Sequence, residues 1–320
     1  MSDILISENI IGADIDALRE RFTVVLEPEL WKHPERLSSF IPEYRALIVR
    51  NQTQVTRELI EAGKQLRVIA RTGVGLDNVD LQAASDHGIV VAFTPDQNTN
   101  SVAELAIGLI LALARKITTA DYDTKRGGWN RQRFTGIEIS GKTLGLLGFG
   151  RIGVSTALKA EAQGMVIVAC DPFIDPKNLM ATGLRVRMMS LEEMLPEADF
   201  VSCHLPKTKE TASLLGYRQF CLMKPAAFFI NTSRGGVVDE NGLIRALQEK
   251  KIAGAALDVR EQEPPLPGQL AEMDNVILTP HVAGLTIEAN HRVITAVCRD
   301  VSAVLNGEAA ENFANFSRPK

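Results

Sequence analysis

Three side chains of this sequence have the chemistry to move a proton to and from a small acid. Arg234, Glu263 and His281 each lie in a short polar segment that follows an apolar run. A guanidinium binds a carboxylate through two parallel hydrogen bonds, and an imidazole exchanges protons near neutral pH. A neighbouring carboxylate favours the protonated imidazole. We therefore predict that these residues form a catalytic group for reversible proton and hydride chemistry.

Each of the three residues also has a structural explanation when it is considered alone. Arg234 could form a surface ion pair, Glu263 could be a solvated acid beside prolines, and His281 could cap a helix or lie in a core. Their positions favour chemistry, because open α/β sheets bind ligands in the loops that follow the carboxyl ends of strands.

A glycine-rich segment predicts a dinucleotide site. Gly148, Gly150 and Gly153 form a G-x-G-x-x-G pattern between the apolar run 143–147 and a helix that extends to about Gln163. Such a site needs a tight turn at the first glycine, close approach of the pyrophosphate at the second, and close packing of helix and strand at the third. A turn that binds nothing is the alternative, and the flanking strand and helix disfavour it.

The next apolar run ends at Asp171, where an acid can bind the ribose hydroxyls of the adenosine half and repel a 2′-phosphate. We therefore expect NAD rather than NADP as the cofactor. Arg151 and Ile152 are assigned to the same site, although Arg151 could equally be a solvated residue at the start of the helix.

Short apolar runs alternate with amphipathic stretches along the whole chain, which predicts parallel sheets covered by helices. We expect an α/β protein with two doubly wound parallel-sheet domains. Residues 1–98 and 286–320 would form a flavodoxin-like substrate domain, and residues 99–285 a Rossmann NAD domain, with the active site in the cleft between them.

Two helices support this division. One is expected from Ser101 to Thr119, starting with a capping box of Ser101 and Glu104. The other follows residue 286 and repeats apolar residues at Val293, Val297 and Val301. We expect this last helix to pack on the first domain.

Composition excludes several classes of protein. The 320 residues include 35 basic and 39 acidic side chains, a net charge of −4, so neither nucleic acid nor a membrane surface is an expected partner. The apolar run 105–114 is about half the ~20 residues that span a bilayer. The four cysteines are scattered, so we expect neither a disulfide framework nor a metal site. With no signal peptide at the N-terminus, a cytoplasmic location is expected.

The segments around Arg234, Glu263 and His281, with the glycine-rich segment, resemble those of the D-isomer-specific 2-hydroxyacid dehydrogenases over nearly the whole chain. The resemblance implies an NAD-dependent transfer of hydride between nicotinamide and C2 of a small 2-hydroxy or 2-oxo acid. It also implies that Arg234 binds the substrate carboxylate and carbonyl, that His281 is the acid/base, and that Glu263 supports it.

Further site residues are implied by the same resemblance. Residues 71–80 resemble the substrate loop of the family, in which backbone amides around Val74 and Gly75 hold the carboxylate. The residues implied to line the cofactor cleft are Leu205, Pro206, Thr211, Thr232 and Asp258, the last near the nicotinamide carboxamide.

Within the family the sequence is most similar to the 3-phosphoglycerate dehydrogenase branch. Arg50 and Arg71 match two of its anion-binding arginines, and Arg131 or Arg133 could reach across a dimer. This favours a substrate with a second anionic group, with surface charges as the alternative. Arg260 replaces the usual aromatic residue, and no regulatory domain is expected after Lys320, so sulfolactate, glycerate and other 2-hydroxy acids also remain open.

Other functions of this fold define the alternatives. Glyoxylate or hydroxypyruvate reduction would use the same residues on another substrate. An NAD-sensing protein similar to the transcriptional corepressors of this fold would bind the cofactor without turnover, but the extended tail of those proteins is not expected here. Formate dehydrogenases have glutamine where Glu263 stands, which disfavours that chemistry. The family also implies a homodimer.

Overall fold

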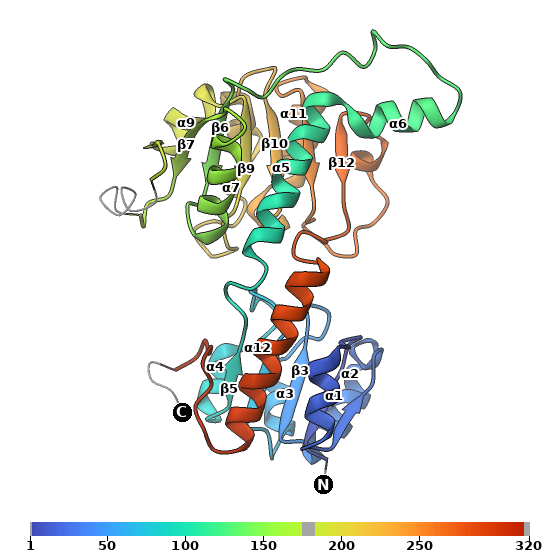
Figure 1. Cartoon of the computed structure of the whole chain (residues 1–320), viewed down its shortest axis with the longest axis vertical. Helices are drawn as coiled ribbons and strands as arrows, with labels where there is room; N and C mark the ends of the chain where they lie inside the picture. The colour runs from blue at the N-terminus through green and yellow to red at the C-terminus, as the bar shows by residue number, and fades with distance from the viewer. Residues whose placement is uncertain (1, 175–182, 317–320) are drawn as a thin grey trace. The chain divides into compact units, whose positions relative to one another are not determined.

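The computed structural model describes residues 2–174 and 183–316. The chain forms two compact units. Unit 1 comprises Met1–Asn98 and Leu285–Lys320, and unit 2 comprises Thr99–Gly284. Each unit contains one sheet in which every pair of neighbouring strands is parallel, with helices on both faces (Figure 1). The predicted fold class of two parallel α/β domains is thus confirmed.

Unit 1 has the strand order β2-β1-β3-β4-β5. Its strands are β1 (Ile4–Ile6), β2 (Val24–Leu26), β3 (Ala46–Val49), β4 (Val68–Arg71) and β5 (Val90–Ala92). Ile4 and Ile6 pack on one face and Leu5 on the other, which is why the strand is apolar at every position. The helices are α1 (Ala13–Arg19), α2 (Pro34–Phe40), α3 (Arg57–Ala62), α4 (Leu81–Asp86) and α12 (Ile287–Leu305), with short 3₁₀ turns η1 (Leu30–Lys32) and η2 (Ile41–Glu43).

The last helix, α12, packs on the sheet of unit 1 as predicted. Val297 and Val301 join Ile4, Ile6 and the neighbouring strands in one buried cluster. Thr286 caps the helix by accepting a hydrogen bond from the backbone of Ala289 at 3.1 Å. Helix α12 therefore belongs to unit 1, although it follows unit 2 in the sequence.

Unit 2 has the strand order β12-β11-β10-β9-β6-β7-β8, the arrangement of a Rossmann fold with one additional strand. Its strands are β6 (Thr143–Leu147), β7 (Val166–Cys170), β8 (Val186–Met188), β9 (Phe200–Cys203), β10 (Phe228–Asn231), β11 (Gly254–Leu257) and β12 (Val276–Leu278). Its helices are α5 (Thr99–Arg115), α6 (Ile117–Lys125), α7 (Arg151–Glu161), α9 (Leu191–Glu197), α10 (Tyr217–Leu222) and α11 (Glu240–Gln248), with 3₁₀ turns η4 (Gly235–Val237) and η5 (Gln269–Glu272).

Two apolar cores fill the space between this sheet and its helices. Helices α5 and α7 pack on one face, and α9, α10 and α11 pack on the other. The strand order reverses between β6 and β9, so the loops after these two strands diverge and leave the crevice in which such sheets bind ligands. The glycine-rich segment follows β6 directly.

The helix predicted from about Ser101 to Thr119 starts two residues earlier and is wrong at its C-terminal end. Helix α5 begins at Thr99, so Ser101 is buried in the first turn of the helix rather than placed at its N-cap, as the predicted capping box requires. The helix ends at Arg115 because Lys116 adopts a left-handed backbone with φ of 52°, and α6 then starts in a new direction. The buried character of the run 105–114 is confirmed at most of its positions.

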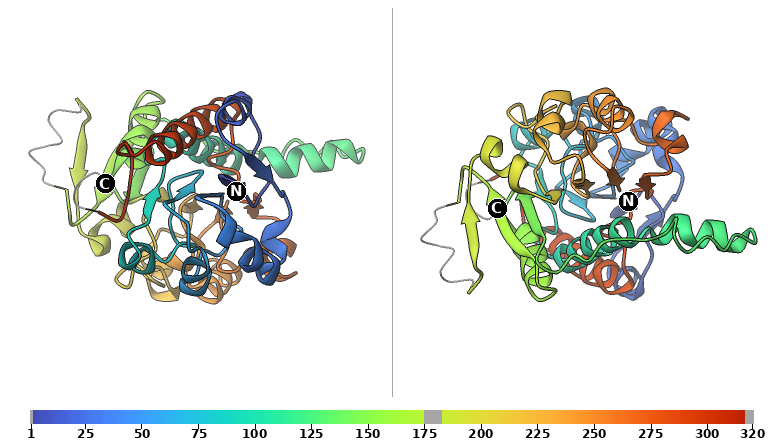
Figure 2. Two further views of the ribbon diagram at one scale, coloured as in Figure 1. Left: turned by 90° about the horizontal axis from the view of Figure 1, so that it is seen from below. Right: turned by 90° about the horizontal axis from the view of Figure 1, so that it is seen from above.

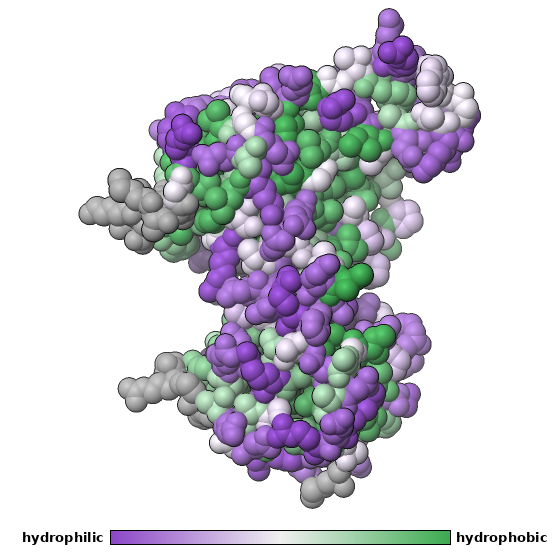
Figure 3. All heavy atoms as spheres, in the orientation of Figure 1, coloured by the Kyte–Doolittle hydropathy of each residue, from purple (hydrophilic) through white to green (hydrophobic). Residues whose placement is uncertain are grey.

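Helix α6 and the segment after it project from the rest of unit 2 (Figures 1 and 2). Apolar residues gather on the face of unit 2 near α5 in the space-filling view (Figure 3). In the part of the chain that the structure describes, we find no helix with the length and apolar character needed to cross a bilayer.

Asp199 precedes β9 and is bonded to Thr143 of β6 and to Lys224, and the lowered pKa of its carboxyl can be tested. It accepts hydrogen bonds from Lys224 Nζ at 2.8 Å and Thr143 N at 2.9 Å. Burial raises the pKa of Asp199, but these bonds and the nearby lysines outweigh it and hold the pKa below the ordinary value of 3.8.

We expect Asp199→Asn to lower the free energy of unfolding at pH 7 by about 0.2–1 kcal/mol, as for other partly exposed ion pairs. A lowered pKa in the folded state stabilises above the unfolded value, so the difference should shrink as the pH falls below 3.8. Urea unfolding of both proteins from pH 7 to pH 3 measures it. A difference that grows toward low pH would contradict the assignment.

Candidate active site

His281 and Glu263 form a short hydrogen bond in unit 2. The distance between His281 Nδ1 and Glu263 Oε2 is 2.6 Å. The side chains are 35% and 31% exposed, so the pair is reachable from solvent while being partly shielded from it. The bond fixes the imidazole orientation and leaves Nε2 as the ring nitrogen available to a substrate.

The loop after β11 holds Glu263 in place. The backbone N–H of Arg260 donates to Glu263 Oε1 at 3.0 Å, so both carboxylate oxygens are occupied. Burial raises the pKa of Glu263, but the bonds from His281 and Arg260, with the charges of His281 and Arg234, outweigh it and lower the pKa. Glu263 is therefore an ionised hydrogen-bond acceptor at neutral pH.

Arg234 follows β10 and contributes its positive charge to the same site. Asn231 stabilises the loop by donating from Nδ2 to the Arg234 carbonyl at 3.0 Å and by accepting from Ser233. Arg234 Nη1 donates to the Ser233 carbonyl at 2.8 Å. Since Arg234 is one of the charges that lower the pKa of Glu263, the structure brings all three predicted catalytic residues together.

The loop that carries His281 is organised by Asp258. Asp258 is 1% exposed, and its carboxylate accepts hydrogen bonds from Thr279 Oγ1 at 2.6 Å, Val282 N at 2.9 Å and Ala283 N at 2.8 Å. His281 itself has a φ of 54°, a left-handed conformation that is uncommon outside glycine and that the surrounding bonds maintain. Asp258 thus supports the loop directly, and a contact with a nicotinamide carboxamide remains a prediction.

The three glycines of the G-x-G-x-x-G segment have three different geometries, each as predicted for a dinucleotide site. Gly148 has a φ of 88°, which a side chain would strain. A Cβ atom on Gly153 would lie 2.4 Å from the Gly148 carbonyl oxygen. A Cβ atom on Gly150 would meet no protein atom within 4 Å, so the backbone there borders open space. Helix α7 starts at the next residue, and no side chain caps it.

The other residues predicted to bind the cofactor lie at the start of α7 and in the loops that follow β7 and β9. Asp171 directly follows β7 and accepts a hydrogen bond from Phe149 N at 2.8 Å, so it contacts the glycine-rich loop. Arg151 is exposed at the start of α7, and Ile152 is half-buried. Leu205 and Pro206 follow β9, and Thr211 closes their loop by donating to the Pro206 carbonyl at 2.6 Å.

Two buried polar atoms beside these loops have no hydrogen-bond partner among the described residues. They are Thr232 Oγ1, which follows β10, and His204 Nδ1, which follows β9. Burial lowers the pKa of His204 to about 4, so the ring is neutral, and Nε2 lies 3.0 Å from Ser202 Oγ. Orphaned polar atoms, the open space at Gly150 and an uncapped helix start fit a polar, anionic cofactor such as NAD.

The predicted substrate residues of unit 1 lie at the carboxyl ends of its strands. Arg71 ends β4 and pairs in register with Val49, the residue before Arg50. Arg50 Nη2 donates to Asn290 Oδ1 at 2.7 Å, and burial lowers the pKa of Arg50 although Glu8 opposes it. Gly73 has a φ of 145° and lies against the Arg71 guanidinium. Val74 and Gly75 follow in this loop, and both are half-buried.

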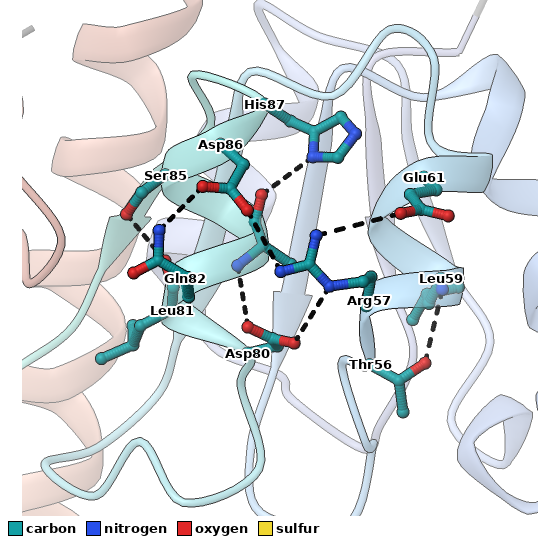
Figure 4. A network of polar contacts seen from close by, with 11 residues as sticks. Thr56, Arg57, Leu59, Glu61, Asp80, Leu81, Gln82, Ser85, Asp86 and His87 are labelled. Carbon is teal, nitrogen blue, oxygen red and sulfur yellow. Dashed lines mark hydrogen bonds and ion pairs between the residues drawn. The ribbon is translucent and has the colours of Figure 1, made fainter.

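A polar network anchors the far end of that loop (Figure 4). Asp80 caps α4 by accepting from Ala83 N at 2.8 Å. Arg57 at the start of α3 lies 3.9 Å from Asp80 and 3.1 Å from Asp86, and so links α3 to α4. These pairs tie the end of the segment from residue 71 to residue 80 to α3 and α4.

Arg131 and Arg133 lie in the segment after α6. Both are exposed, and Arg133 is 3.6 Å from both Asp123 and Asp274 of its own chain. In residues 2–174 and 183–316 no group of three or more His, Cys, Asp or Glu side chains is arranged to hold a metal ion.

One ion pair beside the site, that of Arg260 with Glu240, was not predicted from the sequence. The sequence marks Arg260 only as a departure from the family pattern. Glu240 lies 20 residues away in the sequence, and its one signal is an acid at the first position of a helix directly after the Arg234 segment.

Residues 107–283 match the family model described as D-isomer specific 2-hydroxyacid dehydrogenase, NAD binding domain. D-3-phosphoglycerate dehydrogenase of Methanocaldococcus jannaschii is 44% identical over 317 residues, which cover 99% of this chain and 60% of that protein. Hydroxypyruvate reductase of Thermotoga maritima is 44% identical over 262 residues, 81% of this chain and 84% of that protein. The crystal structure of TT0316 protein from Thermus thermophilus has a TM-score of 0.92 at 34% identity, covering 98% of this chain and 99% of that one.

The chain therefore belongs to the D-isomer-specific 2-hydroxyacid dehydrogenase family, and unit 2 contains the NAD-binding domain of that family. The predicted similarity to the 3-phosphoglycerate dehydrogenase branch is confirmed. The chain spans about three fifths of the length of the two D-3-phosphoglycerate dehydrogenases: 60% of the protein from Methanocaldococcus jannaschii and 59% of the one from Archaeoglobus fulgidus.

Proposed function

We propose that this protein is an NAD-dependent oxidoreductase that interconverts a small 2-hydroxy acid and the corresponding 2-oxo acid. The observation that carries the proposal is the 2.6 Å bond between His281 and Glu263, with Arg234 close enough to affect the pKa of Glu263. An acid/base, the carboxylate that orients it and a cation for the substrate are the groups that this reaction requires.

In the direction of oxidation, His281 Nε2 accepts the proton of the C2 hydroxyl. Glu263 stabilises the imidazolium that results, because its carboxylate is ionised and bonded to Nδ1. Arg234 binds the substrate carboxylate and carbonyl oxygen, which holds the reacting carbon in place and stabilises negative charge that develops on oxygen. In reduction the same residues act in reverse, and His281 donates the proton.

The cofactor would be held by residues of unit 2. When bound, NAD supplies the nicotinamide carbon that accepts or returns the hydride. Gly148 would provide the tight turn, and the backbone amide of Gly150 and the start of α7 would bind the pyrophosphate, with Arg151 and Ile152 beside it. Asp171 would bind the ribose hydroxyls. Gly153 allows the tight packing of the loop, while Leu205, Pro206, Thr211, Thr232 and Asp258 complete the cofactor site.

The substrate that these residues favour carries a second anionic group. Arg50 and Arg71 of unit 1 are neighbours at one edge of its sheet and would bind a phosphate, sulfonate or carboxylate, as in 3-phosphoglycerate or sulfolactate. The backbone amides of Val74 and Gly75 would hold the carboxylate at C1. Arg71 would receive support from Gly73, which leaves room for the guanidinium.

Arg234→Lys should raise KM for the acid about 10- to 100-fold, because losing one or two charge-assisted hydrogen bonds costs about 1.5–3 kcal/mol. We would measure NAD reduction and NADH oxidation against 3-phosphoglycerate, sulfolactate, glyoxylate, hydroxypyruvate and lactate, with enantiomers separated. Arg185→Lys, at a 96% exposed side chain in the same unit, is the control. An unchanged KM in Arg234→Lys would remove Arg234 from the substrate site.

The panel also separates the competing hypotheses. A preference for a doubly anionic acid supports Arg50 and Arg71 as its second clamp, whereas a preference for glyoxylate or hydroxypyruvate supports the reductase named for the Thermotoga relative. NAD binding without turnover of any acid supports an NAD-sensing protein.

We further propose a cytoplasmic homodimer. The support is a cavity of ≈330 Å³ beside the projecting α6, lined by apolar residues such as Leu113, Phe134 and Ile277 together with Lys116 and Arg133. A second copy would cover this apolar face, which a monomer would leave in water. Light scattering of the purified chain distinguishes the dimer from the monomer.

A further inference from the structure

The ion pair of Arg260 and Glu240 lies near the catalytic group and is largely enclosed. Arg260 Nε donates to Glu240 Oε1 at 3.0 Å and Nη2 donates to Oε2 at 2.9 Å, a two-pronged geometry. The two side chains are only 14% and 17% exposed. Such a pair is poor evidence for stability in itself, because removing both charges from water costs about as much as their attraction returns. The two-pronged geometry of the pair instead suits a role in positioning the loop that carries Arg260.

The pair connects the Glu263 loop to the start of α11. Glu240 Oε1 also accepts from Glu261 N at 2.6 Å, so the carboxylate holds both the side chain and the backbone of this loop. Arg260 also contacts the catalytic group, because its backbone N–H donates to Glu263 Oε1 at 3.0 Å. A continuous chain of bonds therefore runs from α11 through Arg260 and Glu263 to His281.

The loop also lies directly against the segment that carries Arg234. A Cβ atom on Gly235 would be 1.9 Å from the Arg260 carbonyl oxygen and 2.5 Å from Glu261 N, so only glycine allows this approach. Glu240 follows the same segment after a short 3₁₀ turn. The Arg260–Glu240 pair, called the clamp below, thus fixes two loops: the loop that supplies Glu263, the partner of the predicted acid/base, and the loop that supplies Arg234, the predicted substrate cation.

The clamp depends on the charges of both Arg260 and Glu240. Glu240 and Glu263 are close enough for the negative charge of Glu263 to oppose ionisation of Glu240. Burial also raises the pKa of Glu240, yet the bonds from Arg260 and the Glu261 amide hold it below its ordinary value. Without the guanidinium, Glu240 would lose both of its bonds to Arg260, and the repulsion between Glu240 and Glu263 would lose the cation that is bonded to Glu240.

We propose that Arg260 and Glu240 are positioning residues that hold Glu263 against His281 for the hydride-transfer reaction. The inference rests on the proposed function. It assigns a purpose to the arginine that stands here in place of the aromatic residue usual in the family, and it extends the catalytic group to the first turn of α11.

The test compares Arg260→Met, Glu240→Gln and the double variant with Glu263→Gln as the reference for a lost contact. We expect Arg260→Met to lower kcat roughly 10- to 100-fold, the usual effect of a misplacement of about 1 Å, with the Kd for NAD unchanged. The pH midpoint of kcat should move in the same direction as in Glu263→Gln. The double variant should lose no more than Arg260→Met, since it removes the uncompensated charge as well.

Arg245→Met is the matched control, because Arg245 forms an exposed ion pair with Glu249 on the same helix, at 2.9 Å, away from the site. It should leave kcat and the pH midpoint unchanged. A kcat of Arg260→Met within twofold of the parent, or a pH midpoint that does not move, would overturn the proposal. So would losses in the two single variants that add up in the double variant.

The imidazole NMR signals of His281 make the proposal testable even without turnover. In Arg260→Met the chemical shifts of the His281 ring should shift toward those measured in Glu263→Gln, because the bond between Nδ1 and Glu263 is weakened, and in Arg245→Met they should not. If no acid is turned over but this shift occurs, the proposed function fails and the positioning role stands. If acids are turned over but the signal and kcat of Arg260→Met match the parent, only the positioning role fails.

Discussion

Replacing His281 by alanine is expected to lower kcat by roughly 10²- to 10⁴-fold, the range for loss of a positioned general acid/base. The imidazole is the one group in the described site that can both take the C2 proton and share its charge with Glu263. The Kd for NAD should remain unchanged, because His281 is not among the residues assigned to the cofactor. Steady-state kinetics and calorimetric titration with NAD separate these effects.

His291→Ala is a suitable control for the removal of an imidazole. His291 lies on α12 with a 72% exposed side chain, 3.6 Å from Asp14, and should leave kcat unchanged. Residual activity of His281→Ala within tenfold of the parent would mean that another residue moves the proton, and the mechanism proposed for unit 2 would have to be abandoned.

The second large effect is expected from Gly150→Val. A Cβ atom at this position meets no protein atom within 4 Å, and the φ of −75° suits any residue, so we expect the fold to stay intact. The valine would instead occupy the space assigned to the pyrophosphate. Each backbone bond to phosphate that it blocks should weaken NAD binding about 10- to 100-fold, equivalent to about 1.5–3 kcal/mol.

Two other glycines make the experiment specific. Gly108→Ala adds a methyl group at an exposed helical position that is equally open, and should stabilise α5 by about 0.5–1 kcal/mol without affecting NAD. Gly153→Ala would place its Cβ 2.4 Å from a carbonyl oxygen, and should lower both Tm and NAD affinity. If Gly150→Val bound NAD as tightly as the parent, the glycine-rich loop would not be the cofactor site.

The elements that were predicted from sequence are those whose signals are local. The run 143–147 is strand β6 with the predicted bounds, because both faces of a covered parallel sheet demand apolar residues. The geometry of the glycine-rich segment was predictable for a similar reason, since the positive φ of Gly148 and the contact of Gly153 with the Gly148 carbonyl are both local. β8 gave no such signal, because its three residues are partly exposed at the edge of the sheet.

What could not be predicted depends on contacts between distant residues. The start of α5 at Thr99 and its end at the left-handed Lys116 follow from packing rather than from the capping pattern at Ser101. The clamp of Arg260 on Glu240 joins two separate loops. The bonds of Asp258 likewise exist only once β11 and β12 lie side by side. The residue types identified the candidate catalytic side chains. The hydrogen bonds and ion pairs that hold these side chains in place form only when the chain folds.

The most direct test of hydride transfer follows the hydrogen itself. NADH carrying deuterium at C4 would be incubated with the protein and each 2-oxo acid of the panel, and the products analysed by mass spectrometry with separation of enantiomers. We predict one deuterium at C2 in a single enantiomer of the product, and incorporation that is roughly 10²- to 10⁴-fold slower with His281→Ala. Tight binding of NADH with no deuterium in any acid would contradict the enzyme and favour a protein that senses the cofactor.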